Sequence, residues 1–131
     1  MVRLNNKIYS CPVDVALSFI GGKWKILILS HLKNNQNRGF AELKSIYPRL
    51  SEKMLAQQLK ELERDELIIK NTVSVKPLRV QYNLSERGLT LSPLFKYLSK
   101  FGLDYLKRNN IDYVKEQKTQ NAINNKLKKR P

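Results

Sequence analysis

Residues 40–65, FAELKSIYPRLSEKMLAQQLKELERD, decide the fold. In their first part, apolar side chains recur every three residues, at Phe40, Leu43 and Ile46. This spacing predicts a short helix, and the helix has to end before Pro48 because the residue preceding a proline disfavours helical geometry. A second helix is expected after a tight connection.

The second helix of this stretch begins at Ser51, whose side chain suits an N-cap, and runs to about Asp65. One stripe of it is apolar and is expected to face the core: Leu55, Leu59 and Leu62, with Met54 beside it. The opposite face is polar and carries Glu52, Lys53, Gln57, Lys60 and Arg64, with the small Ala56 among them. Such a face is able to press against another surface.

Two more helices are predicted on the N-terminal side of this pair. Apolar residues at helical spacing follow Pro12, with Asp14 as N-cap or first-turn anion, until Gly21-Gly22 breaks the pattern. Residues 23–32 then present a broad apolar surface, which predicts a helix buried on most sides. The segment that ends at Cys11-Pro12 is expected to be an extended arm.

On the C-terminal side, residues 67–73 and 79–84 favour strands through their β-branched and aromatic content. The connection Ser74–Leu78 contains a proline and suits a hairpin with a projecting tip, on which Lys70, Lys76 and Arg79 place positive charge. Helix resumes at Ser85-Glu86, with a break near Gly88 and a new cap around Ser92-Pro93.

Residues 93–106 carry more apolar side chains than a small core absorbs, and an apolar helix at the end of a small domain usually seeks a partner. The predicted fold is therefore mainly α with a two-stranded β-hairpin wing, a winged helix-turn-helix with N- and C-terminal dimerisation helices. We expect an N-terminal arm at residues 1–10, the winged domain with its dimerisation helix at 11–110, and a basic polar tail at 111–131 that is disordered or loosely helical.

The formal net charge of +14 points to a polyanionic partner such as DNA, RNA or an anionic membrane. No run approaches the roughly 20 apolar residues of a membrane span, and the N-terminus lacks the apolar core of a signal peptide, so a cytoplasmic protein is expected. No carboxylate pair, Ser-His-Asp set or metal-ligand cluster is present, and His31 has no second ligand at metal spacing. We therefore expect neither an enzyme nor a metal or other cofactor.

Several stretches together resemble the HxlR family of bacterial regulators, distant relatives of the MarR regulators. They are CPV at 11–13, IGGKW at 20–24, ILIL at 26–29, GFAEL at 39–43, SEKML at 51–55, LKELE at 59–63 and VQYNLSERG at 80–88. The resemblance spans residues 11–106 and implies a homodimer on double-stranded DNA, with the Ser51–Asp65 helix in the major groove and the hairpin tip along the backbone or minor groove. The chain departs from the family at Glu66, where glycine is common, and near Ala56 and Gln57, where a hydroxyl or basic residue is usual.

The candidate base readers are Gln57, which can pair bidentately with adenine, and Lys53, which can donate to guanine. The candidate phosphate contacts, which position the protein without reading sequence, are Arg49, Ser51, Lys60, Lys76 and Arg79. The alternative for Gln57 and Lys53 is simple exposure to solvent.

Cys11 is the only cysteine and cannot form an internal disulfide. Positive neighbours and a helix N-terminus both raise the reactivity of a thiol, and the resemblance implies a sensor of oxidants or electrophiles at this position. Oxidation would give an intersubunit disulfide, a mixed disulfide or an adduct. The alternative is a buried, inert thiol.

The function expected is a sequence-specific regulator, a repressor before an activator, bound as a homodimer to a pseudo-palindromic operator and switched through Cys11. The alternatives are the same regulator without thiol sensing and a sequence-neutral packaging protein driven by the basic tail, which would bind with steep salt dependence and little sequence preference.

Overall fold

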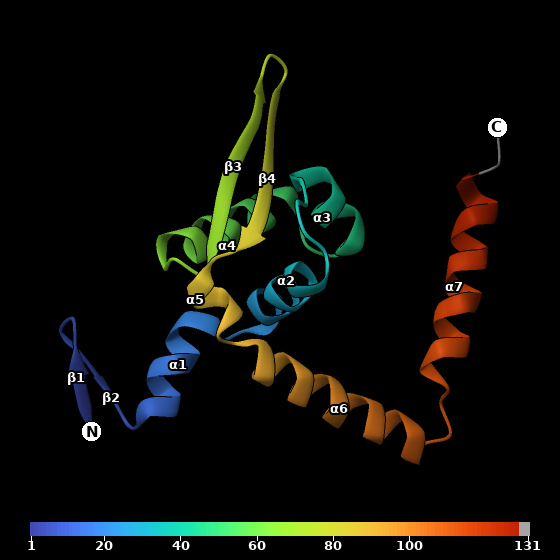
Figure 1. Cartoon of the computed structure of the whole chain (residues 1–131). Helices are drawn as coiled ribbons and strands as arrows, with labels where there is room; N and C mark the ends of the chain where they lie inside the picture. Colours follow the sequence, from blue (N-terminus) through green and yellow to red (C-terminus); the bar gives the residue numbers. More distant parts are fainter. Residues whose placement is uncertain (129–131) are drawn as a thin grey trace. The chain divides into compact units, whose positions relative to one another are not determined.

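The computed structural model describes residues 1–128 (Figure 1). The chain divides into two compact units: the first ends at Ser92 and the second begins at Pro93. The helices of the first unit are α1 (Pro12–Ile20), α2 (Lys23–Asn34), α3 (Phe40–Ile46), α4 (Glu52–Arg64) and α5 (Glu86–Leu89). Its strands are β1 (Val2–Leu4), β2 (Lys7–Tyr9), β3 (Ile68–Val75) and β4 (Leu78–Leu84). Helices α6 (Ser92–Arg108) and α7 (Tyr113–Lys128) follow, and the predicted winged helix-turn-helix architecture is confirmed.

The core of the first unit is built where the apolar spacing predicted it. The fully buried side chains are Ile28 and Leu29 of α2, Leu43 of α3, Leu50, and Leu55, Leu59 and Leu62 of α4. In α2 only Lys23 and Asn34 are exposed, so this helix is covered on most sides, as expected. The apolar stripe of α4 therefore seats that helix on the core and leaves its polar face outward.

Helix α4 is followed by a residue in the left-handed conformation. Glu66 has φ +61°, a conformation that costs little in glycine and more in any residue with a Cβ. The turn is held by Leu67 N, which donates to Leu62 O at 2.9 Å, and by Ser85 Oγ, which donates to Glu66 O at 2.6 Å. The hydrogen bonds compensate for the absence of glycine and direct the chain into β3.

Strands β3 and β4 form the wing, an antiparallel hairpin that stands out beyond the helices of the first unit (Figure 1). Pairing continues to Val75 and Leu78, with a register shift between Thr72 and Ser74. The prediction of a five-residue connection was wrong, because both strands extend further and only Lys76-Pro77 is left as the tip. The backbone of Arg38 adds an isolated antiparallel bridge to Tyr82 at the base of the wing.

The N-terminal segment is a paired hairpin rather than the single extended arm that was predicted. Val2 pairs with Tyr9 and Leu4 with Lys7, and the chain reverses at Asn5 and Asn6. These two residues have φ +49° and +64°, and asparagine tolerates this left-handed region well enough to form a two-residue hairpin turn. Asp14 lies in the first turn of α1, while Cys11 occupies the N-cap position.

The second unit consists of helices α6 and α7. Helix α6 carries a stripe of exposed apolar side chains, which we call the α6 stripe: Tyr97, Leu98, Phe101 and Tyr105. Tyr113–Lys128 is helical, the second of the two alternatives expected for the tail, and residues 129–131 lie outside the described part of the chain. None of the helices in residues 1–128 combines the length and apolar character that a membrane span requires.

Candidate nucleic-acid interface

Helix α4 has a capped N-terminus and an exposed polar face. Met54 N donates to Ser51 Oγ at 3.1 Å, so the hydroxyl of Ser51 serves as the predicted N-cap. Lys53, Gln57 and Lys60 are exposed, on the side of the helix opposite its buried leucines. Because these side chains share one face of a 13-residue helix, they are able to enter a groove together.

The other predicted contacts come from the connection before α4 and from the wing. Arg49 is exposed in the turn between α3 and α4, and Lys76 and Arg79 are exposed at the far end of the hairpin. A hollow of about 330 Å³ lies between α4 and the base of the wing, with Lys60 and Lys70 among its lining residues. Lys70 therefore belongs with the candidate phosphate contacts, although the sequence indicated only that it decorates the wing.

Gln57 is not a free side chain. Its Nε2 donates to Glu61 Oε1 at 3.2 Å, and Glu61 Oε2 is paired with Lys25 Nζ of α2 at 2.9 Å. The bonds from Lys25 and then from Gln57 hold the pKa of the Glu61 carboxyl below its usual value. Sequence reasoning missed this chain of contacts: the four-residue spacing of Gln57 and Glu61 was visible, but Lys25 approaches only through packing of α2 on α4.

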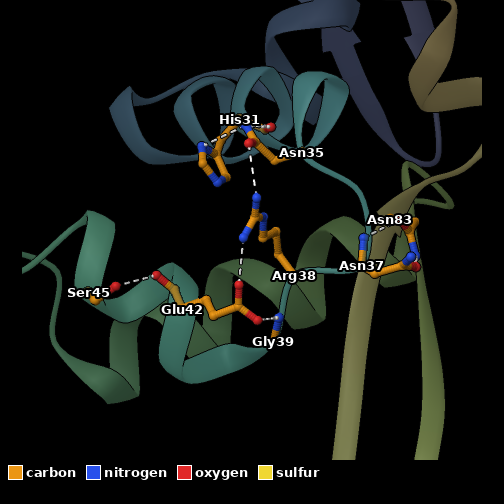
Figure 2. Close-up of polar contacts among 8 residues, drawn as sticks. All are labelled: His31, Asn35, Asn37, Arg38, Gly39, Glu42, Ser45 and Asn83. Carbon is orange, nitrogen blue, oxygen red and sulfur yellow. Dashed lines mark hydrogen bonds and ion pairs between the residues drawn. The ribbon is translucent and has the colours of Figure 1, made fainter.

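A second polar network joins α2, α3 and the wing through Arg38, which was not among the predicted residues (Figure 2). Arg38 Nη1 donates to Glu42 Oε2 at 2.7 Å, and Nη2 donates to Asn35 Oδ1 at 3.1 Å. The Arg38 guanidinium, followed by the backbone amide of Gly39, lowers the pKa of the Glu42 carboxyl. The backbone of Arg38 meanwhile exchanges hydrogen bonds with Tyr82, so one residue ties α3 to the wing.

A separate pair of asparagines lies near this network (Figure 2). Asn37 N donates to Asn83 Oδ1 at 2.8 Å, and Asn83 Nδ2 donates to Asn37 Oδ1 at 2.9 Å, which locks the loop before α3 against β4. His31 lies near the end of α2. Among the described residues, no group of three or more His, Cys, Asp or Glu is placed to hold a metal ion. Burial and then the charge of Arg38 lower the pKa of His31.

Cys11 is exposed at the N-terminus of α1, so the thiol is not buried within the single chain. The backbone amide of Asp14, the hydroxyl of Ser10 and the amide of Val13, in that order, lower the pKa of the Cys11 thiol. Ser10 Oγ lies 3.9 Å from Cys11 Sγ and 3.2 Å from Asp14 Oδ2. A thiol at a helix N-terminus gains thiolate character, and the thiolate is the reactive form.

Residues 19–110 match the family model described as HxlR-like helix-turn-helix. The chain belongs to the HxlR-like helix-turn-helix family. This family comprises DNA-binding transcriptional regulators, and the chain is a transcriptional regulator with a helix-turn-helix fold. The resemblance read from the sequence is thereby confirmed.

Three regulators illustrate the similarity. YtcD, an HTH-type transcriptional regulator of Bacillus subtilis (strain 168), is 37% identical over 125 residues, which cover 95% of this chain and 98% of YtcD. The crystal structure of YtcD superposes with a TM-score of 0.69 at 39% identity and covers 74% of this chain and 98% of its own. The redox regulator HypR in its oxidised form superposes with a TM-score of 0.68 at 35% identity, covering 72% and 96% of the two chains. A MarR-family regulator from Porphyromonas gingivalis W83 gives a TM-score of 0.65 at 34% identity, covering 74% and 94%.

Proposed function

We propose that this regulator binds a pseudo-palindromic operator as a homodimer and places α4 of each subunit in the major groove. The observation that carries the proposal is the division of α4 into a fully buried leucine stripe and an exposed polar face beside a projecting basic wing. A recognition helix packs on the protein core through one face and inserts the opposite, exposed face into the major groove.

The candidate contacts divide into two roles. Gln57 and Lys53 read base edges, because glutamine matches adenine and lysine matches guanine. The phosphate contacts are Arg49, Ser51, Lys60, Lys76 and Arg79, and Lys70 joins them from the side of the wing. The net charge of +14 supplies the attraction that precedes recognition.

The α6 stripe supports dimerisation. The side chains of Tyr97, Phe101 and Tyr105 are 68%, 69% and 63% exposed, and a contiguous apolar surface of this kind on a soluble domain marks a contact site. On α1, Val13 and Leu17 are exposed as well. A two-fold pair of subunits would present two α4 helices to half-sites spaced by about one helical turn.

The test is selection of bound duplexes from a random pool, followed by footprinting of the best sequence. Two-fold symmetric protection with a repeated half-site is expected. Protection of a single asymmetric site would contradict the dimer, and binding without sequence preference would favour a packaging protein. In that case deletion of residues 113–131 would remove most of the binding, whereas a regulator keeps its preference for the selected sequence.

The wing contacts give a prediction of their own. Lys76→Ala and Arg79→Ala are each expected to weaken binding to all duplexes alike and to reduce the slope of log affinity against log salt by about 1, because each phosphate contact releases about one counterion. Fluorescence anisotropy at several salt concentrations measures this slope. Lys33→Ala on α2 serves as the charge-matched control. A selective loss of the operator with an unchanged slope would show that the wing reads bases.

We also propose that Cys11 is the switch. HypR, to which the chain is similar, is a redox regulator by its name. In this chain an oxidant such as hypochlorite would convert the Cys11 thiolate to a sulfenic acid, which condenses with a second thiol and releases water. Since the chain has one cysteine, that thiol is Cys11 of the second subunit or a small thiol of the cell. The bond would alter the separation of the two recognition helices and release the operator.

The chemistry of Cys11 gives the second prediction. Because the pKa of its thiol is lowered, alkylation by iodoacetamide is expected to reach half its maximal rate at a lower pH than alkylation of a free cysteine peptide. Mass spectrometry follows the adduct. In the operator assay, wild-type protein is expected to lose affinity after hypochlorite and Cys11→Ser to keep it. An equal loss in both proteins would exclude Cys11 as the sensor.

The expected compartment is the cytoplasm, where such a regulator meets DNA. The direction of regulation proposed is repression, because a dimer that covers its operator blocks access to it. A reporter driven by the selected operator should rise when the regulator is removed. A fall would indicate an activator.

A further inference from the structure

The side-chain amide of Gln57 is held in one orientation by Glu61 and Lys25, which are not themselves candidate base readers. Gln57 Nε2 lies 3.2 Å from Glu61 Oε1. The other carboxylate oxygen, Glu61 Oε2, lies 2.9 Å from Lys25 Nζ, and the side chains of Lys25 and Glu61 are only 13% and 26% exposed. The chain of contacts therefore begins in the packed contact between α2 and α4 and ends at the exposed face of α4.

The chemistry of the three groups fixes the direction of each bond. An ionised carboxylate only accepts hydrogen bonds, and an ammonium only donates them. The amide of Gln57 must therefore turn its NH₂ group toward Glu61, because the reversed amide would bring two oxygens together. Lys25 holds the carboxylate from the side of the core, so the carboxylate cannot swing away without breaking an ion pair.

This arrangement leaves a defined pattern for a base. One N–H of Gln57 is used by Glu61, and the second N–H and the carbonyl oxygen remain available. Adenine in the major groove presents one donor, the N6 amino group, next to one acceptor, N7. A glutamine whose amide cannot turn over offers the matching acceptor and donor in a single order.

We infer that Glu61, anchored by Lys25, is a positioning residue that orients the Gln57 amide toward an A·T pair and so sets the base preference of α4. The inference rests on the proposed role of α4 as the recognition helix. It differs from that role in assigning part of the specificity to two residues that do not touch the base.

The test measures a ratio of affinities rather than an affinity. From the selected operator, four duplexes are made that differ at the position that responds to Gln57→Ala, and binding to each is compared. A ratio is unaffected by the fraction of active protein, so a variant that folds less well still gives a valid result. Glu61→Gln removes the carboxylate but keeps its shape, and an amide at this position no longer forces one orientation. Glu63→Gln is the control, because it removes the same charge from an exposed acid of α4.

The wild-type protein and Glu63→Gln are expected to prefer A·T by about tenfold, and Glu61→Gln by about twofold or less. The double variant Lys25→Met with Glu61→Gln removes the pair without leaving an unpaired lysine and should behave like Glu61→Gln. In a Gln57→Ala background, Glu61→Gln should change nothing further, because the two residues act through one contact.

Three results separate the possible failures. An unchanged preference in Glu61→Gln would overturn the positioning role, and so would an equal loss in Glu63→Gln or a further loss in the Gln57→Ala background. If the preference for A·T depends on other residues of α4 but not on Glu61, the positioning role fails and the proposed function is still supported. If selection yields no preferred sequence at all, the proposed function itself fails.

Discussion

Phe101→Glu is expected to separate the subunits of the proposed homodimer and to weaken operator binding roughly 10²–10⁴-fold, the range over which linking two sites raises avidity. Phe101 lies in the middle of the α6 stripe, flanked by Tyr97 and Tyr105, and is 69% exposed in the single chain. A carboxylate buried at the centre of an apolar contact, facing its own copy across a two-fold axis, is strongly unfavourable. Each subunit alone would hold only one half-site.

The molar mass in solution, from light scattering or sedimentation, and the affinity for the selected operator should change together. Lys100→Gln is the matched control: it lowers the charge by the same amount on a neighbouring exposed position of α6, outside the stripe. That variant should have the molar mass of the wild-type protein and bind the operator with unchanged affinity. If Phe101→Glu were a dimer of unchanged affinity, the α6 stripe would serve another contact and dimerisation would have to be sought elsewhere.

The parts of the fold that sequence reasoning predicted well are those governed by local rules. Helix α3 ends before Pro48 and Ser51 caps α4, since each feature depends on a few neighbouring residues. The buried stripe of α4 follows from the 3.6-residue period alone. The face that remains outward is then determined, and with it the location of the candidate base readers.

The features that were missed depend on contacts between distant parts of the chain or on very short elements. Lys25 lies 36 positions before Glu61, and nothing in either segment indicates the pairing. Arg38 stands in a polar loop and becomes important only because β4 returns beside it. The hairpin at residues 2–9 has strands of three residues each, too short for a clear alternating pattern, although Asn5-Asn6 is a turn signal in retrospect.

Leu55→Ala is expected to lower the free energy of unfolding by about 2–5 kcal/mol, the usual cost of a cavity left by a buried leucine. Leu55 is completely buried on the core side of α4, so no rearrangement at the surface can fill the space. The total stability of a domain of this size is about 5–15 kcal/mol, and the loss is therefore a large part of it. Denaturant titration followed by circular dichroism measures the change.

Met54→Ala, one position earlier, is the matched control. Met54 is 48% exposed, and its truncation should cost less than about 1 kcal/mol. The two variants also separate the packing of α4 on the core from the recognition of the operator sequence. Leu55→Ala should reduce the fraction of protein able to bind while the ratio between operator and mutated operator stays constant, because Leu55 never faces the base pairs. A changed ratio would mean that the cavity lets α4 shift on the core, and the position of the reading face would then depend on core packing as well as on its own side chains.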